Sequence, residues 1–596
     1  MASRRLGWLA AAAGALAVAL GGCAAVPVSG VAQPLTGASG QPQQFVQPLP
    51  PPGPRPGEIA KDVVLGFLHA SASFALDPAA ARAYLAPGVR WNPTGTVTVV
   101  SPDLSFGQPL NVPHVSGPAL QRVVVKGQRV ATINRSGQYA YQSDAATQFT
   151  FTLAKYGPKL LIAQLPAGPH LLLTQDDFQA VFQPHNLYFY APDAYPSGGL
   201  VPDPVYAPVQ GPKSALSTNV AGSLVHGLIN DRGSWLSGPT TTEFPKGTTL
   251  LRPVTISNQT ALVDLGGKAD AASAGELALM YAQLRQTLTS SAYSPAVASS
   301  VQLAIDGKVQ YPASTSDVVP VSGSATSPKK PRALYLASDG VVKQLPGGAK
   351  VPGVAPGVSQ LDSPAGVTAM AITAVGTDQI AAAVPQGDGC AVRVGTVGSA
   401  AEYPSYTIST SGGPCTSLSW DNNGGLWAVT GVGIWVLQAG NSQPVQVSAP
   451  TMLPPRARVL SLRMAPDAVR AALLVRAQGS TQLYVAAVRF GARSVAFGPA
   501  VPVGTDLAGS GITAMSWYSP YYLLAVSGSQ LYQVPLTGGQ SQSLFAGAVP
   551  AGVQVLTASG GYVAVGTSSG TVYVSSSPYI SWTRVPGRAS APAYPG

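Results

Sequence analysis

Residues 460–475 read LSLRMAPDAVRAALLV, which is an apolar segment, a turn containing Pro and Asp, and a second apolar segment. Short apolar runs bounded by turn residues predict buried strands. Segments like the first recur along the C-terminal half, 41 to 53 residues apart, and each is followed by a turn and another small apolar strand. The recurring segments are residues 368–372, 416–420, 460–464, 513–517 and 554–558.

A repeat of about 45 residues with about four strands is the signature of a β-propeller blade. Five repeats are visible, and residues 333–345 supply strands for an incomplete sixth. Because closing a propeller often splits one blade between the chain ends, we predict six blades over residues 332–590, leaving five or seven open. Residues 591–596 are then a tail. The alternative is a β-sandwich or two small barrels.

Upstream of the repeats, helical and strand patterns are mixed. Val63, Val64 and Phe67 lie on one face of a predicted helix, and Asp77 before Pro78 is typical of a helix start. Alternating apolar segments follow from residue 96, so we predict an α+β domain over residues 58–184.

A second α+β domain is predicted over residues 185–312, followed by a linker at 313–331. Its last helix should begin at Ser273, because Ser273 and Glu276 have the spacing of a capping box. Asp203 and Asp306 are expected in turns, where Asp bonds the local backbone. The predicted architecture is therefore multidomain, with two α+β domains followed by an all-β propeller.

The N-terminus is typical of an exported bacterial lipoprotein. Arg4 and Arg5 precede an apolar run of about 15 residues, which suits a secretory signal peptide and is short for a membrane span. The run ends in LGGC, which resembles the lipobox, whose cysteine carries the diacylglyceryl lipid. We expect a signal peptide over residues 1–22 and lipid on Cys23; the alternative is an ordinary secretory signal with a chance cysteine. Export by the general or the twin-arginine route stays open.

Residues 23–57 are rich in Pro, Gln, Gly and Ser and predict an extended tether between the lipid and the first domain. Two cysteines remain beyond it, Cys390 and Cys415. Export exposes thiols to an oxidising compartment, so a disulfide between them is the favoured interpretation, and two separate buried thiols are the alternative.

The search for an active site is mostly negative. The five histidines show no metal-ligand spacing, no Gly-rich phosphate loop follows a strand, and Asp176 and Asp177 are better explained as helix-start residues. We therefore expect no catalytic residues, no metal and no cofactor beyond the covalent lipid. A binding protein fits this inventory better than an enzyme.

Charge gives one further hypothesis. Residues 325–596 carry a net charge of +7 out of +10 for the whole chain. Arginines crowd one stretch of the predicted propeller, where only Asp467 opposes them, and they form a possible docking face for an acidic protein domain or an anionic envelope polymer. The alternative is a set of scattered solvent-facing side chains. The stretch contains Arg456, Arg458, Arg463, Arg470, Arg476, Arg489 and Arg493.

Several segments resemble the LpqB-type actinobacterial lipoprotein family. The start of the mature chain, CAAVPVSG at 23–30, is similar to that family, and NLYF at 186–189, VPDP at 201–204 and FPKGT at 244–248 resemble its GerMN module. The turn MAPDA at 464–468 is a degenerate form of the Ser-Pro-Asp-Gly turn of bacterial propellers. The resemblance covers the whole chain, and the GerMN stretch is its most specific part.

The resemblance implies a role beside the membrane. The family is thought to act with a sensor histidine kinase of a two-component system that controls cell-envelope and division genes. It implies contact with the extracellular domain of that kinase, by a protein anchored at the outer face of the cytoplasmic membrane. The alternatives are a lipoprotein that binds cell-wall glycan such as peptidoglycan, and, less favoured, a propeller enzyme. An exported chain should not bind nucleic acid.

Overall fold

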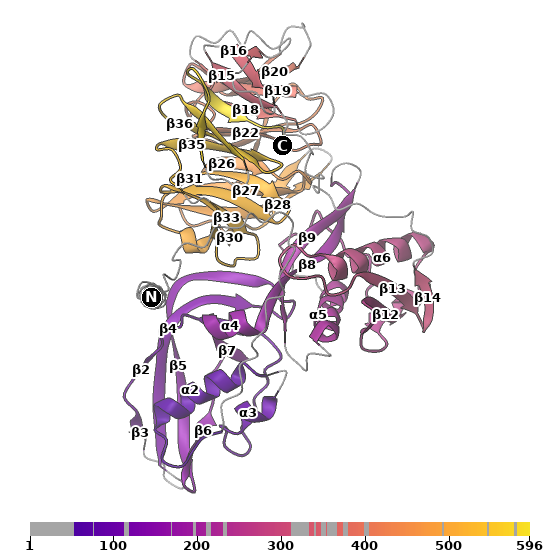
Figure 1. Ribbon diagram of the computed structural model, residues 1–596, viewed down its shortest axis with the longest axis vertical. Helices are drawn as coiled ribbons and strands as arrows, with labels where there is room; N and C mark the ends of the chain where they lie inside the picture. Colours follow the sequence, from indigo (N-terminus) through magenta and orange to yellow (C-terminus); the bar gives the residue numbers. More distant parts are fainter. Residues whose placement is uncertain are drawn as a thin grey trace, which may run out of the picture. The chain divides into compact units, whose positions relative to one another are not determined.

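The computed structural model contains two α+β domains and a ring of β-sheets (Figure 1). The second α+β domain is called the middle domain below. The structure describes residues 53–74, 77–112, 119–168, 170–194, 198–209, 216–230, 235–311, 333–338, 341–346, 353–354, 366–373, 379–397, 404–491, 494–544, 547–576 and 581–596. Cys23 and the tether up to residue 52 lie outside these residues, so their assignments stay predictions.

The N-terminal domain is one antiparallel sheet with a parallel edge pair, covered by helices. Its elements are α2 (Ala60–Ser71), α3 (Pro78–Arg82), β1 (Val97–Val100), β2 (Ser105–Phe106), β3 (Leu110–Val112), β4 (Leu120–Ile133), β5 (Tyr139–Tyr156), β6 (Lys159–Gln164), β7 (Leu171–Thr174) and α4 (Gln175–Val181). The sheet order is β6-β5-β4-β1-β7. Helix α2 buries Val63, Val64 and Phe67 against it, and the Asp77 carboxylate caps α3 at the backbone of Ala79.

The middle domain consists of a long hairpin and a mixed sheet with two helices. Its elements are β8 (Phe182–Ala191), β9 (Gly199–Pro208), α5 (Leu216–Asn230), β10 (Thr248–Leu250), β11 (Thr255–Ser257), β12 (Thr260–Gly267), η1 (Lys268–Ala271), α6 (Ala274–Thr289), β13 (Ser300–Ile305) and β14 (Lys308–Tyr311). Strands β12 and β13 are parallel, and α6 is the crossover between them. The predicted capping box at Ser273 and Glu276 is present.

Asp203 is not in a turn, contrary to our expectation. It lies within β9, which pairs along its whole length with β8 and with no other strand. Proline lacks the N–H that a central strand needs, but an edge strand tolerates it, so Pro202 and Pro204 do not break this hairpin. The turn-forming residues misled the prediction here because pairing with β8 overrides their local preference.

The C-terminal region is a propeller of six blades, as predicted. The strands are β15 (Leu334–Ser338), β16 (Val341–Leu345), β17 (Gly353–Val354), β18 (Ala369–Ile372), β19 (Gln379–Gln386), β20 (Gly389–Thr396), β21 (Ser405–Ser409), β22 (Ser417–Trp420), β23 (Leu426–Thr430), β24 (Gly433–Leu437), β25 (Val445–Val447), β26 (Arg458–Met464), β27 (Arg470–Ala477), β28 (Ser480–Phe490), β29 (Val495–Phe497), β30 (Val501–Val503), β31 (Ile512–Ser519), β32 (Tyr522–Ser527), β33 (Gln530–Pro535), β34 (Gln542–Ser543), β35 (Val553–Ser559), β36 (Tyr562–Thr567), β37 (Val572–Ser576), β38 (Thr583–Arg584) and β39 (Ser590–Ala593). The recurring sequence segments correspond to β18, β22, β26, β31 and β35, which start successive blades and neighbour one another around the ring.

The ring closes through residues that we expected to form a tail. Strand β39 pairs with β15 and lies between β35 and β18, so it supplies the inner strand of the blade that β15, β16 and β17 begin. Ala591 and Ala593 are buried in the core of that blade. The predicted tail at 591–596 is therefore wrong, because its small side chains carry no strong strand signal and acquire strand structure only by pairing.

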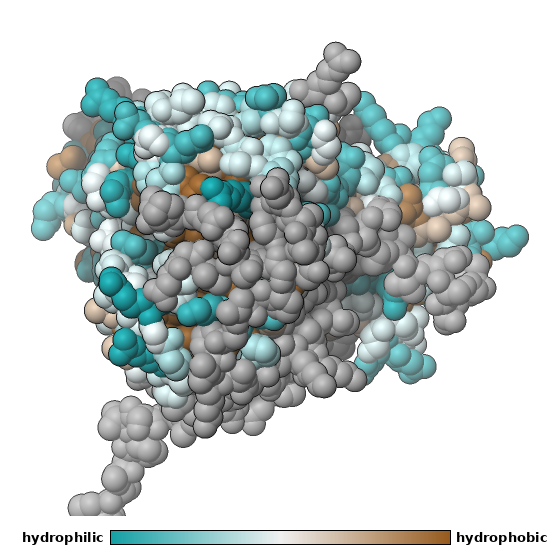
Figure 2. Space-filling model, turned by 90° about the horizontal axis from the view of Figure 1, so that it is seen from above, coloured by the Kyte–Doolittle hydropathy of each residue, from teal (hydrophilic) through white to brown (hydrophobic). Residues whose placement is uncertain are grey.

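In the face shown in Figure 2, hydrophilic and near-neutral side chains cover most of the coloured surface and apolar ones form small patches. Within the described residues, no helix is long and apolar enough to cross a membrane.

Candidate functional site

Of the seven arginines of the predicted docking face, the six that the structure describes do not form one surface. Arg456, Arg458, Arg476 and Arg489 are exposed, Arg463 is partly buried, Arg470 is fully buried, and Arg493 lies outside the described residues. Arg489 lies against the middle domain, because a Cβ added to Gly238 would come within 3.4 Å of its Nε. Arg470 thus forms an ion pair in the core, and Arg489 contacts the middle domain. Arg463 and Arg476 lie at the channel of the propeller.

Arg470 belongs to the core, which corrects its place in the docking face. Its Nε donates to Asp467 at 2.6 Å, and both side chains have no exposed area. Asp467 also accepts from the backbone N–H groups of Val469 and Arg470, and Ala468 adopts the left-handed φ of 68° that glycine usually takes. The degenerate turn at residues 464–468 therefore keeps the Asp that organises it, and Arg470 neutralises the buried carboxylate.

The same turn meets a buried junction at which all three domains converge. Nη1 of Arg470 donates a long hydrogen bond of 3.5 Å to the carbonyl of Pro202 in β9. The next residue, Asp203, is fully buried and accepts from Gln138 of the N-terminal domain at 3.1 Å and from the indole of Trp235 at 3.0 Å. Because an unpaired buried carboxylate is costly, these donors tie the domains together at Asp203.

Tyrosines form a second contact between the middle domain and the propeller. The Tyr188 hydroxyl lies 2.9 Å from that of Ser290 and 3.0 Å from that of Tyr521, and the Tyr293 hydroxyl donates to the Tyr521 carbonyl at 2.7 Å. Burial raises the pKa of Tyr188 and of Tyr293 well above the usual value, so both stay neutral hydroxyls. Nothing in the sequence pattern marked these contacts, since they join residues far apart in the chain.

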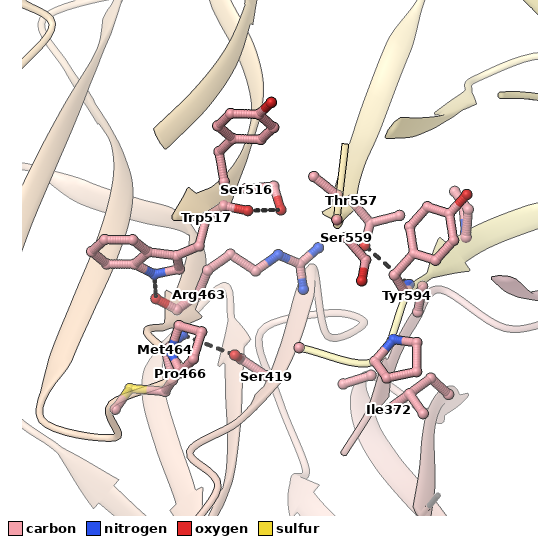
Figure 3. A pocket seen from close by; sticks show the side chains of 18 of the residues that line it. Ile372, Ser419, Arg463, Met464, Pro466, Ser516, Trp517, Thr557, Ser559 and Tyr594 are labelled. Atoms are coloured by element: carbon pink, nitrogen blue, oxygen red, sulfur yellow. Dashed lines mark hydrogen bonds between the residues drawn. The ribbon is translucent and has the colours of Figure 1, made fainter. Parts of the chain in front are cut away.

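The propeller channel holds Arg463 (Figure 3). Its side chain projects from β26 towards the space between Ser516, Thr557 and Tyr594. A cavity of about 190 Å³ lies at one end of the channel, where the last residues of the inner strands line it. A second cavity, of about 590 Å³, is lined by the first residues of the inner strands, at the other end. Arg463 lines both cavities, and burial lowers the pKa of its guanidinium to about 10, which leaves it charged at neutral pH.

A third cavity, of about 830 Å³, lies where the N-terminal domain meets the middle domain. Its lining mixes apolar residues such as Phe182 and Leu187 with amide and hydroxyl side chains, including Asn92, Asn134 and Asn230. Arg135 and His226 also line it. Apolar surface with several amide and hydroxyl groups and one arginine suits a ligand that carries many hydrogen-bonding groups.

Cys390 and Cys415 are joined by a disulfide, the pairing that the sequence favoured, with a Cα–Cα distance of 5.5 Å. It links β20 to the segment before β22 and so joins two neighbouring blades covalently.

No group of three or more metal-ligating side chains occurs in the part of the chain that the structure describes. At the start of α4 the Asp177 backbone N–H donates to the Thr174 hydroxyl, and the Asp177 carboxylate accepts from that hydroxyl, in keeping with the predicted helix-start role.

Comparison with known proteins finds matches to all three domains. Residues 53–179 match the family described as "Lipoprotein LpqB, N-terminal domain", residues 186–311 match "Sporulation and spore germination", and residues 339–595 match "Lipoprotein LpqB beta-propeller domain". Curated relatives named lipoprotein LpqB match over nearly the whole length. The protein of Thermobifida fusca is 30% identical, covering 98% of this chain and 97% of the relative, and that of Streptomyces avermitilis is 28% identical, covering 100% and 99%.

Proposed function

The chain belongs to the LpqB lipoprotein family, and from this we propose that it modulates a two-component sensor histidine kinase by protein contact. In this proposal, lipid on Cys23 anchors it at the outer face of the cytoplasmic membrane. Residues 23–57 then act as a tether that lets the folded domains reach the extracellular part of the kinase, in a system linked to cell-envelope and division control.

The junction at Asp203 is the observation that carries the proposal. A regulator that acts by contact must have different affinities for two states of its partner. Gln138, Trp235 and Arg470 bring three domains to one buried carboxylate and its neighbouring carbonyl. The domains can therefore present a composite surface to a partner, which separate domains on flexible linkers could not do. The role requires no catalysis, and the relatives are named as lipoproteins rather than as enzymes.

The test is crosslinking of the intact protein in its own membranes, followed by mass spectrometry. We expect peptides of a sensor kinase's extracellular domain among the crosslinked partners. A Trp235→Phe variant, which removes the indole donor to Asp203, should weaken that crosslinking while leaving the protein at the membrane. Membranes that contain the kinase in quantity but yield no kinase crosslink would contradict the proposal.

The anchor is tested separately by Cys23→Ala. Without the thiol no lipid can be attached, so we expect the variant to be folded but released from the membrane fraction. Immunoblots of membrane and medium fractions, with the exposed Arg584→Gln as a control that leaves Cys23 and the disulfide in place, measure the distribution. Full retention of Cys23→Ala in the membrane would overturn the lipid assignment.

A second function, binding of cell-wall glycan, has one observation in its favour. The cavity between the N-terminal and middle domains offers amide and hydroxyl groups, together with Arg135, beside apolar surface. Sedimentation with purified cell wall should then retain the wild-type protein and lose an Asn134→Ala, Asn230→Ala double variant. Equal retention of the two proteins would exclude this cavity as a glycan site.

A further inference from the structure

Arg463 is a cation in the propeller channel without an acidic partner. Its Nη1 donates to the backbone carbonyl of Leu418, and within the described residues it forms no ion pair. Burial disfavours its charge, as the lowered pKa shows. By contrast, Arg470 of the same blade pairs with Asp467 in the core. In the part of the chain that the structure describes, an acidic side chain pairs with Arg470 and none pairs with Arg463.

The surroundings of Arg463 contain hydroxyl groups and no acidic side chain. Among the described residues that line the two channel cavities there is no Asp or Glu. Ser419, Ser516 and Thr557 line the smaller cavity from three different inner strands. Gly596 also lines it, and no ion pair joins it to Arg463 within the described residues. Hydroxyls can donate to an anion that the guanidinium attracts.

The larger cavity adds a second cation on the way to Arg463. Arg476 lines it, is exposed, and lies directly opposite Arg458 in the pairing of β26 with β27. Like charges opposite each other on neighbouring strands are destabilising, so this arrangement is not explained by stability of the blade. Positive charge at the mouth of a channel concentrates anions and raises their rate of association.

We propose that the propeller channel binds a small molecule bearing an oxyanion, either a carboxylate or a phosphate. The oxyanion pairs with the Arg463 guanidinium, which can donate two parallel hydrogen bonds to it. The ligand enters through the larger cavity past Arg476. The middle domain contacts the loops at the other end of the channel, where Tyr521 and Asp467 lie, so the larger cavity is the entrance away from that contact. This site is independent of the proposed kinase contact.

The test uses the full-length protein in detergent, titrated with inorganic phosphate in one arm and with succinate in the other. Trp517 lines the smaller cavity and donates to the Arg463 carbonyl, so tryptophan fluorescence reports on the site, and calorimetry gives the affinity. We expect Arg463→Gln to lose about ten-fold or more in affinity, because a charge-assisted hydrogen bond contributes about 1.5–3 kcal/mol. The arm with the tighter binding identifies the oxyanion.

The matched control is Arg584→Gln, which removes the same charge from an exposed position on the outer strand β38. It should bind as the wild type does, whereas Arg476→Gln should bind more weakly and with a smaller dependence on salt. If Arg463→Gln fails to fold, Arg463→Lys keeps the charge without the paired donors and should still lose affinity. Absence of binding to both probes in the wild type, or equal affinity in wild type and Arg463 variants, would overturn the proposal.

Discussion

Replacing Arg470 by Met should destabilise the propeller more than replacing any exposed arginine. The substitution keeps a long apolar side chain but leaves the Asp467 carboxylate buried, with two backbone N–H donors and no cation. Removing one partner of a buried ion pair costs about 3–5 kcal/mol. The variant also loses the hydrogen bond to Pro202 and the contact of the guanidinium with the Trp517 ring, 5.3 Å from its centroid.

Five of the eight tryptophans lie in the propeller, so near-ultraviolet circular dichroism during heating follows this domain. At about 2 °C per kcal/mol for a domain of this size, Arg470→Met should lower the propeller's Tm by about 6–10 °C. The control Arg584→Met should change the free energy of unfolding by less than about 0.5 kcal/mol.

A double variant separates the ion pair from the packing. Arg470→Met combined with Asp467→Asn removes the unpaired charge, so it should recover part of the lost stability relative to Arg470→Met alone. A loss below about 1 kcal/mol for Arg470→Met, or a double variant less stable than the single one, would refute the reasoning.

Three further predictions concern other contacts. The double variant Cys390→Ser, Cys415→Ser should lower the propeller's free energy of unfolding by about 3 kcal/mol, because it lacks the disulfide. Reducing agent should lower the Tm of the wild type and leave the Tm of the double variant unchanged. A hydrogen bond with Asp177 raises the pKa of His69 above 6.5. Protonated His69 therefore stabilises the N-terminal domain below pH 6.5, and this stabilisation is lost as the pH rises through the raised pKa. The His69→Gln variant should show a flatter dependence of Tm on pH over that range. Trp235→Phe should increase amide hydrogen exchange around β9, and unchanged exchange there would contradict the junction's role.

Local sequence patterns correctly predicted the strands and helices that are stabilised by residues close to them in the chain. The blades recur because each repeats the same strand and turn pattern, and Asp77 and Ser273 cap their helices through hydrogen bonds to residues two or three positions away. The closing strand β39 was missed because its partner β15 lies far along the chain, and β9 was missed because its prolines and Asp203 resemble a turn although the strand pairs with the preceding strand β8. No local pattern carries that information.

The arginine positions show the same limit within a single strand. Arg470 and Arg476 are both in β27, six residues apart, so alternation places them on the same face. Arg470 begins the strand beside the Asp467 turn and the middle domain, and Arg476 lies near its other end, at the channel mouth. Which of the two is buried depends on the neighbouring domain, and charge counting along the sequence could not decide it.

The closing strand also constrains how the protein folds. Strand β39 pairs with β15, about 250 residues earlier in the chain, and the ring cannot close until both are present. Until then β15 lacks its inner partner and presents an open strand edge, which is a template for aggregation. We therefore expect truncation within residues 590–593 to destabilise the whole ring, and chaperones to bind the protein while that edge is open.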